Sequence, residues 1–375
     1  MIRYRHPAAL TVVAILSGTL TSCDQSADDA AKTCLTGKLT YDHHDAEAGK
    51  DAAKALTNSV ARNANWELRG KTSASGRTRL LASGVTDRNN GTFHACSDGP
   101  GPLPELYVRF RSSSTKLWRV IGPASKTEFT FETRHLRNVT GSNDLGSVKA
   151  PADQQGAWKI VDTLNDLYRK AAEANSSGSA CWTRHQRSGK CDRLTFTWAA
   201  DATKGGYWDP GSRNVVLEAE DANSKHLILH EAGHWLQFEL YGHRDTDAPG
   251  CDGHPFDRTT TRGCAWTEGF ADAVAAYSLG DYRYVYGDGS DFDLHNDPNT
   301  PWDKGDAVQG RIGSSLLDLW AKDGPDGGSW NKHIQLMTDH HSTDFNEYFT
   351  ADRPKAGLPT TDAAKQILDD HTITY

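Results

Sequence analysis

The sequence predicts an α+β protein built in two parts. Residues 34–148 hold short β-prone runs separated by turn signals such as Asn89-Asn90-Gly91 and Gly99-Pro100-Gly101-Pro102. Residues 151–375 instead alternate strands with longer runs whose apolar residues recur at helical spacing. A chain of 375 residues is long enough for two parts that each bury a core.

The first part is predicted to be a β-sandwich, because short strands with tight turns between them are typical of two packed sheets. The expected strands lie at 35–41, 66–68, 79–81, 92–96, 106–110, 118–121 and 128–131. The stretch 143–152 contains Gly, Ser and Pro, and it marks a natural boundary before the second part.

The second part is predicted to combine a mixed sheet with several helices and to end in a mainly helical lobe. Asn223 or Ser224 can cap one helix, and Gly242 and Gly280 can end two of them. The expected elements are a helix around 158–168, strands at 194–198 and 214–218, and helices at 225–242, 266–280 and 308–320.

The helix expected at 225–242 contains the H-E-x-x-H sequence His230-Glu231-Ala232-Gly233-His234. Residues four apart share a helix face, so both histidines can bind one zinc ion with Glu231 beside it. Zinc would supply a Lewis acid and an acidified water, and Glu231 would be the general base for amide hydrolysis. Gly233 lowers the stability of the helix by about 1 kcal/mol relative to Ala. Close approach of another backbone at this position would explain why a glycine stands there. The alternative is an ordinary buried helix with two hydrogen-bonded histidines.

A catalytic zinc site needs a third protein ligand and an open fourth position. The metzincin pattern fails, because Gln237 and Leu240 stand where its Gly and third His belong. The helix expected at 266–280 offers Glu268 as the third ligand. Asp272 lies one turn later and can accept a hydrogen bond from a ligand imidazole. The alternative is a pair of solvated acids.

These residues resemble the gluzincins, the H-E-x-x-H…E zinc metallopeptidases, over about residues 215–280. The resemblance implies that His230, His234 and Glu268 bind one zinc per chain. It also implies Glu231 as the catalytic base and Asp272 as the supporting carboxylate.

The same resemblance implies a zincin-like domain over 151–375, with 214–218 as an edge strand that pairs with extended substrate. The transition-state donor of the family, usually Tyr, His or Arg, has no diagnostic match here. The available side chains are Tyr282, Tyr284, Tyr286, His295, Arg311, His340 and His341.

The segment 86–93 resembles a turn of transthyretin-like and carboxypeptidase-regulatory-like domains. This resemblance covers about 34–148 and implies an accessory domain. An inhibitory pro-segment is the alternative reading of that part.

Residues 1–22 are predicted to be a lipoprotein signal peptide. A basic start precedes an apolar run at 8–20, which is short for a membrane span. Leu20-Thr21-Ser22-Cys23 resembles a bacterial lipobox, so Cys23 would become lipidated, with 23–33 as a polar tether. The protein would then sit on the extracellular face of the bacterial cell membrane. A plain secretory signal and a secreted protein are the alternative.

Seven cysteines are an odd number for an exported protein, and leaving Cys23 aside gives six. Proximity favours Cys181–Cys191 and Cys251–Cys264, which leaves Cys34–Cys96. This is a preference, since six cysteines allow 15 connectivities. The pair 251–264 would brace the loop between the two zinc-binding helices.

The net charge of −8, without a basic stripe, argues against a nucleic-acid partner. The acidic loop at 287–306 could bind calcium, although it lacks EF-hand spacing, and a solvated loop is the alternative. The sequence leaves the oligomeric state open.

The sequence therefore predicts a secreted, membrane-tethered zinc endopeptidase that cleaves protein or peptide substrates. Two alternatives stay open. One is a cell-surface binding lipoprotein whose zinc is structural and closed by four ligands. The other is a zinc hydrolase that acts on a cell-wall amide.

Overall fold

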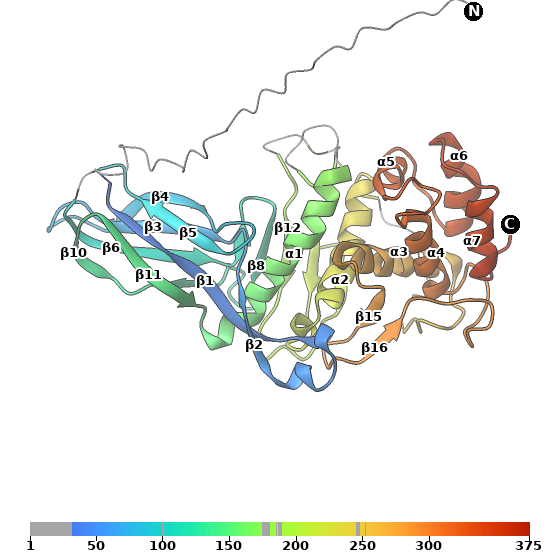
Figure 1. The fold of residues 1–375 in the computed structure, drawn as a ribbon, viewed down its shortest axis with the longest axis horizontal. Coiled ribbons are helices and arrows are strands. Elements are labelled where there is room, and N and C mark those ends of the chain that lie inside the picture. Colours follow the sequence, from blue (N-terminus) through green and yellow to red (C-terminus); the bar gives the residue numbers. More distant parts are fainter. Residues whose placement is uncertain are drawn as a thin grey trace, which may run out of the picture.

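The structure is a computed structural model (Figure 1) and describes residues 32–99, 101–174, 181–184, 186, 190–244, 248–251 and 253–375. The expected signal peptide, Cys23 and most of the expected tether therefore lie outside the described residues. Among the residues described, no helix is both long enough and apolar enough to cross a membrane.

The N-terminal part consists of two β-sheets. In the first, the long strand β1 pairs antiparallel with β2 and β5 and parallel with β11. In the second, the order is β10-β6-β3-β4, and β9 also pairs with β6. The strands are β1 (Cys34–His44), β2 (Leu56–Val60), β3 (Asn65–Lys71), β4 (Arg79–Val85), β5 (Thr92–Cys96), β6 (Leu103–Arg111), β9 (Thr130–Glu132), β10 (Leu136–Val139) and β11 (Ser142–Lys149).

These two sheets bury a shared core. Burial alternates along β3, where Trp66 and Leu68 point inward, as expected when one face of a strand meets the core. Phe93 of the first sheet and Phe110 of the second lie edge to face, with ring centroids 5.2 Å apart. The N-terminal part is thus rich in sheet, as the sequence predicts.

A third sheet joins the two parts of the chain. Its order is β13 (Tyr207–Asp209), β14 (Asn214–Val216), β12 (Leu194–Thr197), β8 (Trp118–Ile121) and β7 (Ser113–Ser114). Strand β8 runs parallel to β12, and all four residues of β12 are buried, as is usual for a central strand with both faces covered. The strand predicted at 118–121 therefore exists, but it belongs to this sheet and not to the sandwich.

Helices make up most of the C-terminal part, which confirms the predicted α+β class (Figure 1). They are α1 (Gln155–Ala174), α2 (Lys225–Leu240), α3 (Arg262–Leu279), α4 (Gln309–Trp320), α5 (Asn331–Asp339), α6 (Arg353–Lys355) and α7 (Ala363–Asp370), with a π-helix at Glu347–Asp352 and short 3-10 helices at Ala46–Ala48, Ala52–Lys54, Ala152–Gln154 and Asp221–Asn223. A hairpin of β15 (Arg283–Val285) and β16 (Asp291–Asp293) lies between α3 and α4.

One sequence prediction about a strand is wrong. The strand predicted at 214–218 is not an edge, because β13 covers it through an antiparallel pairing that sets Trp208 opposite Val215. The stretch 143–152, which the sequence marks as a boundary, also contains most of strand β11, and this strand pairs with β1 from Cys34 to Thr40. Hydrogen bonding to a distant strand overrides the local turn preference of its glycine and serine residues.

Three disulfides join the described cysteines, and they are the pairs that proximity favoured. Cys34–Cys96 links two paired strands, while Cys181–Cys191 and Cys251–Cys264 close short loops. The loop closed by Cys251 and Cys264 leads into α3.

Candidate metal centre

Helix α2 carries the H-E-x-x-H residues, and its start is fixed by two oxygen atoms. The Ser224 hydroxyl accepts a hydrogen bond from the Leu227 amide at 3.0 Å, as the predicted cap requires. Glu47, from the N-terminal part, accepts hydrogen bonds from the amides of Lys225 (2.5 Å) and His226 (3.2 Å). A carboxylate at this end also suits the helix dipole.

Helix α3 packs closely against α2 and positions Glu268. Thr261 caps it, and Gly280 ends it in the left-handed conformation with φ 67°. A Cβ placed on Gly233 would come within 2.9 Å of Ala271 Cα in α3. Glycine thus lets the two backbones approach, which is the reason the sequence suggested for a glycine beside the site.

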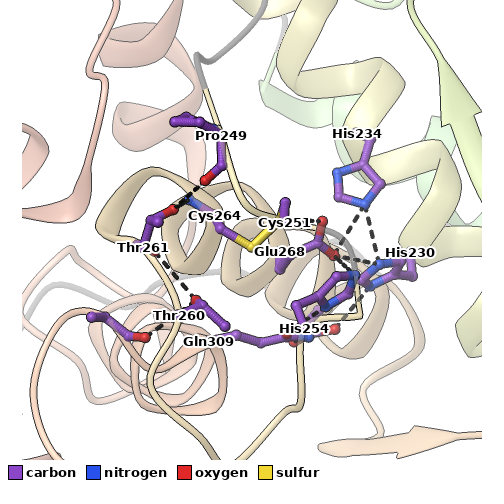
Figure 2. Close-up of a disulfide and its surroundings, with 12 residues drawn as sticks. His230, His234, Pro249, Cys251, His254, Thr260, Thr261, Cys264, Glu268 and Gln309 are labelled. Atoms are coloured by element: carbon purple, nitrogen blue, oxygen red, sulfur yellow. Dashed lines mark hydrogen bonds and ion pairs between the residues drawn. A yellow bond between two sulfur atoms is a disulfide. The ribbon is translucent and has the colours of Figure 1, made fainter.

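Three side chains from these helices converge on one point (Figure 2). His230 Nε2 lies 3.2 Å from His234 Nε2 and 3.2 Å from Glu268 Oε2. His234 Nε2 lies 3.4 Å from the same Glu268 oxygen. Two imidazole nitrogens and a carboxylate oxygen gathered this closely are a donor set that suits zinc.

A chain of hydrogen bonds supports the site from behind. Asp272 Oδ1 accepts from His230 Nδ1 at 2.8 Å, so the lone pair of His230 Nε2 faces the other donors. Asp272 Oδ2 accepts from Gln309 Nε2 at 2.9 Å. Since the Gln309 amide donates there, its Oε1 must accept from His254 Nδ1, 2.9 Å away. One carboxylate therefore sets the tautomers of two histidines.

Burial and charge act in opposite directions on the two glutamates. Burial raises the pKa of Glu231, whose Oε2 has no hydrogen-bond partner among the described residues. Burial also works to raise the pKa of Glu268, but His234 and His230 outweigh it and hold that pKa well below its usual value. Glu268 thus stays an anion suited to a metal, while Glu231 is suited to accept a proton.

The site opens into a cleft. A cavity of about 280 Å³ is lined by His230, Glu231, His234, His254, Glu268 and Tyr284, among others. A neighbouring cavity of about 290 Å³ shares His234, Trp208, Ala248 and Thr267 with it and adds Phe238 and Arg244. The metal-binding atoms of His230, His234 and Glu268 are therefore reachable from a cleft wide enough for more than one residue of substrate.

Of the seven proposed transition-state donors, Tyr284 lines this cleft, with its ring 5.5 Å from that of His230. Arg311 instead donates to Asn296 and to backbone carbonyls. His341 packs against Tyr241. The remaining candidates do not line the cleft: Tyr282, Tyr286, His295 and His340.

The sequence analysis missed His254 and Gln309. His254 Nε2 lies 3.6 Å from Glu268 Oε2, and His254 is about one-third exposed in the cleft. Its only sequence signal is its place three residues after Cys251, inside the disulfide loop. Cys251 Sγ lies 3.5 Å from Glu268 Oε1, so the Cys251–Cys264 bridge holds this loop against the third predicted ligand (Figure 2).

The sequence offers two metal sites, one in the acidic loop at 287–306 and one at the H-E-x-x-H residues, and the structure distinguishes between them. No group of three or more close metal-binding side chains among the described residues comes from the acidic loop at 287–306. His230, His234 and Glu268 do form such a group, with all donor atoms within 4.8 Å of one another. The residues present therefore fit zinc at the H-E-x-x-H site.

Comparison with known families agrees with this geometry. The family model described as the mycolysin C-terminal domain matches residues 174–372, and the one described as the mycolysin middle domain matches 34–157. Neither match supports the resemblance of 34–148 to transthyretin-like domains. No curated protein and no solved structure matches the chain. The chain belongs to the mycolysin family and is a zinc metalloprotease.

Proposed function

We propose that this protein is a zinc endopeptidase of gluzincin type in which His230, His234 and Glu268 hold the metal and Glu231 is the general base. The observation that carries the proposal is the open cleft over three convergent donors, with the buried Glu231 in the same wall. Zinc bound there would supply Lewis acidity and lower the pKa of a bound water to about 7.

In this proposal, Glu231 accepts a proton from the attacking water and then donates it to the leaving amide nitrogen. The raised pKa of Glu231 favours the first of these steps, because a stronger base accepts a proton more readily. Tyr284 lines the same cleft and is proposed to donate a hydrogen bond to the developing oxyanion.

The substrate is proposed to bind in an extended form along β13. Tyr207 and Trp208 of this strand line the cleft, and β13 ends the third sheet on that side. A peptide added to this edge would lie beside the cleft that contains the three predicted ligands, and this cleft continues past His234 into the second cavity. That arrangement suits cleavage within a chain and favours an endopeptidase.

Lipidation at Cys23, a tether over 23–33 and location at the outer face of the membrane remain proposals. An accessory role for 34–148 and a catalytic domain at 151–375 remain proposals too. A purely structural zinc would need a fourth protein ligand. His254 Nε2 lies 3.6 Å from Glu268 Oε2, but His254 does not fall within the 4.8 Å group of His230, His234 and Glu268.

The test is peptide-library cleavage together with metal analysis on Glu231→Gln and Glu268→Ala. Glu231→Gln should keep zinc and lose hydrolysis by at least about 100-fold, the usual contribution of a general base. Glu268→Ala should lose both zinc and hydrolysis. Substantial cleavage by Glu231→Gln would remove the assigned role, and cleavage confined to cell-wall amides would favour that substrate class instead.

A further inference from the structure

A second group of metal-binding side chains lies at the other end of α2. Glu239 is in the last turn of this helix, His243 follows the helix, and Asp192 comes from the segment after the disulfide-bonded Cys191. His243 Nε2 lies 3.1 Å from Asp192 Oδ2 and 3.3 Å from Glu239 Oε2. None of these residues lines the cleft described above.

Glu239 is a buried carboxylate with unused bonding capacity. Its side chain is 1 % exposed, and its Oε1 has no hydrogen-bond partner among the described residues. Its other oxygen accepts from Gln186. A cation bound beside this carboxylate would offset the cost of burying its charge.

The spacing of this group matches that of the H-E-x-x-H site. In both groups one imidazole Nε2 lies 3.1–3.3 Å from two other metal-binding atoms. One ring N–H can point well at only one of two carboxylates, whereas an ion between the three groups would bind all of them. The ligand atoms of Asp192, Glu239 and His243 also lie within 4.8 Å of one another.

From this geometry we infer that Asp192, Glu239 and His243 form a second site for a divalent transition-metal cation, in addition to the one at His230. An imidazole and two carboxylates suit zinc and its neighbours, whereas calcium takes six to eight oxygen ligands and no nitrogen. The bound ion would fasten the segment after Cys191 to the end of the helix that carries the H-E-x-x-H residues.

The experiment is equilibrium dialysis of the full-length protein against zinc buffered at micromolar free concentration, followed by elemental analysis. Wild type should bind two zinc ions per chain, and His243→Ala and Asp192→Asn should each bind one. His295→Ala is the matched control, because His295 pairs with Asp293 at 2.8 Å on the exposed surface. It should keep two.

The Glu268→Ala background separates the two sites. There, zinc should still raise the melting temperature, and adding His243→Ala should abolish that rise. One zinc in wild type and none in Glu268→Ala would overturn the second site while leaving the catalytic site intact. Two zinc ions in His243→Ala, or binding of calcium in place of zinc, would overturn it as well. One zinc that persists in Glu268→Ala and disappears in His243→Ala would support the second site and refute Glu268 as a ligand.

Discussion

Asp272 connects side chains of the candidate metal centre through two hydrogen bonds. It is almost fully buried, and each of its oxygens accepts one hydrogen bond, from His230 and from Gln309. Because a carboxylate can only accept, it fixes the direction of both donors. Asp272 is therefore a positioning residue that acts through His230 and, by way of Gln309, through His254.

Replacing Asp272 with Asn should lower zinc affinity by about 10- to 100-fold, the usual effect of losing such a supporting group. The new amide places an N–H group opposite a donor, either His230 Nδ1 or Gln309 Nε2. Competition with a zinc chelator measures the change. Asp318→Asn is the control, since Asp318 also pairs with a histidine, His371, at 2.8 Å but away from the cleft. An Asp272→Asn affinity within twofold of wild type would contradict the role.

The sequence predicted the part of this network that obeys helix spacing. His230 and His234, and likewise Glu268 and Asp272, are four residues apart on one helix each, so local geometry suffices to place each pair on one face. His254 and Gln309 could not be found this way. His254 comes from a loop and Gln309 is the first residue of α4. Only tertiary packing brings Gln309 to Asp272 and His254 to Gln309.

At the scale of elements, two helix crossings set the site, and each depends on a glycine. Gly233 lets α2 approach α3, as described above. Gly269 does the same between α3 and α4, where a Cβ would lie 2.7 Å from the Gln309 carbonyl oxygen and 2.9 Å from Ile312 Cβ. The Gln309 carbonyl oxygen is part of the backbone and cannot move independently of α4. A side chain at position 269 would therefore displace α4, and Gln309 with it.

Gly269→Ala should therefore destabilise the protein, although alanine favours a helix by about 1 kcal/mol over glycine. Overpacking typically costs about 1–3 kcal/mol, which outweighs that gain. Urea unfolding of the zinc-loaded protein gives the free energy of unfolding. Gly313→Ala is the graded control, because its nearest contact is a looser 3.3 Å. Equal stability of the two variants would show that the close approach at Gly269 is not limiting.

Helices and strands with strong local sequence patterns could be predicted, whereas the strands that pair with one another could not. The predicted helix at 225–242 corresponds to α2, and the predicted strand at 92–96 matches β5 residue for residue. Pairing depends on segments far apart in the chain, so the sequence could not show that β8 joins β12 or that β13 covers β14. Because β13 covers β14, the sheet edge proposed to bind the substrate is β13 and not the strand at 214–218.

At the scale of the whole molecule, the N-terminal part is packed against the C-terminal part, which carries the H-E-x-x-H residues. Trp118 of β8 packs on Trp182, which packs on Trp235 of α2, with ring centroids 5.7 and 5.1 Å apart. Glu47, also from the N-terminal part, accepts hydrogen bonds at the start of α2, as described above. The buried side chains form one continuous core through both parts.

The contact that Glu47 makes with the start of α2 should stabilise the fold to an extent that depends on pH. Burial alone would raise its pKa, but the hydrogen bond to His226 and the charges of Lys159 and Lys225 lower it from 4.5 to about 2. A carboxyl group with a lower pKa in the folded state stabilises the fold above pH 4.5, and that contribution is lost as the pH falls from about 4.5 to about 2. The shift corresponds to at most about 3 kcal/mol at neutral pH.

Glu47→Gln should accordingly lower the free energy of unfolding at pH 7 by about 1–3 kcal/mol, since the amide keeps the shape but not the charge at the helix start. The difference from wild type should shrink as the pH falls below 4.5. Unfolding curves of both proteins at several pH values test this, and the comparison cancels the protonation of the histidines common to both. Glu132→Gln is the control, because Glu132 pairs with Arg109 and His135 on the N-terminal sheets, away from α2. A wild-type advantage that stays constant down to pH 2 would mean that the charge of Glu47 does not stabilise the start of α2.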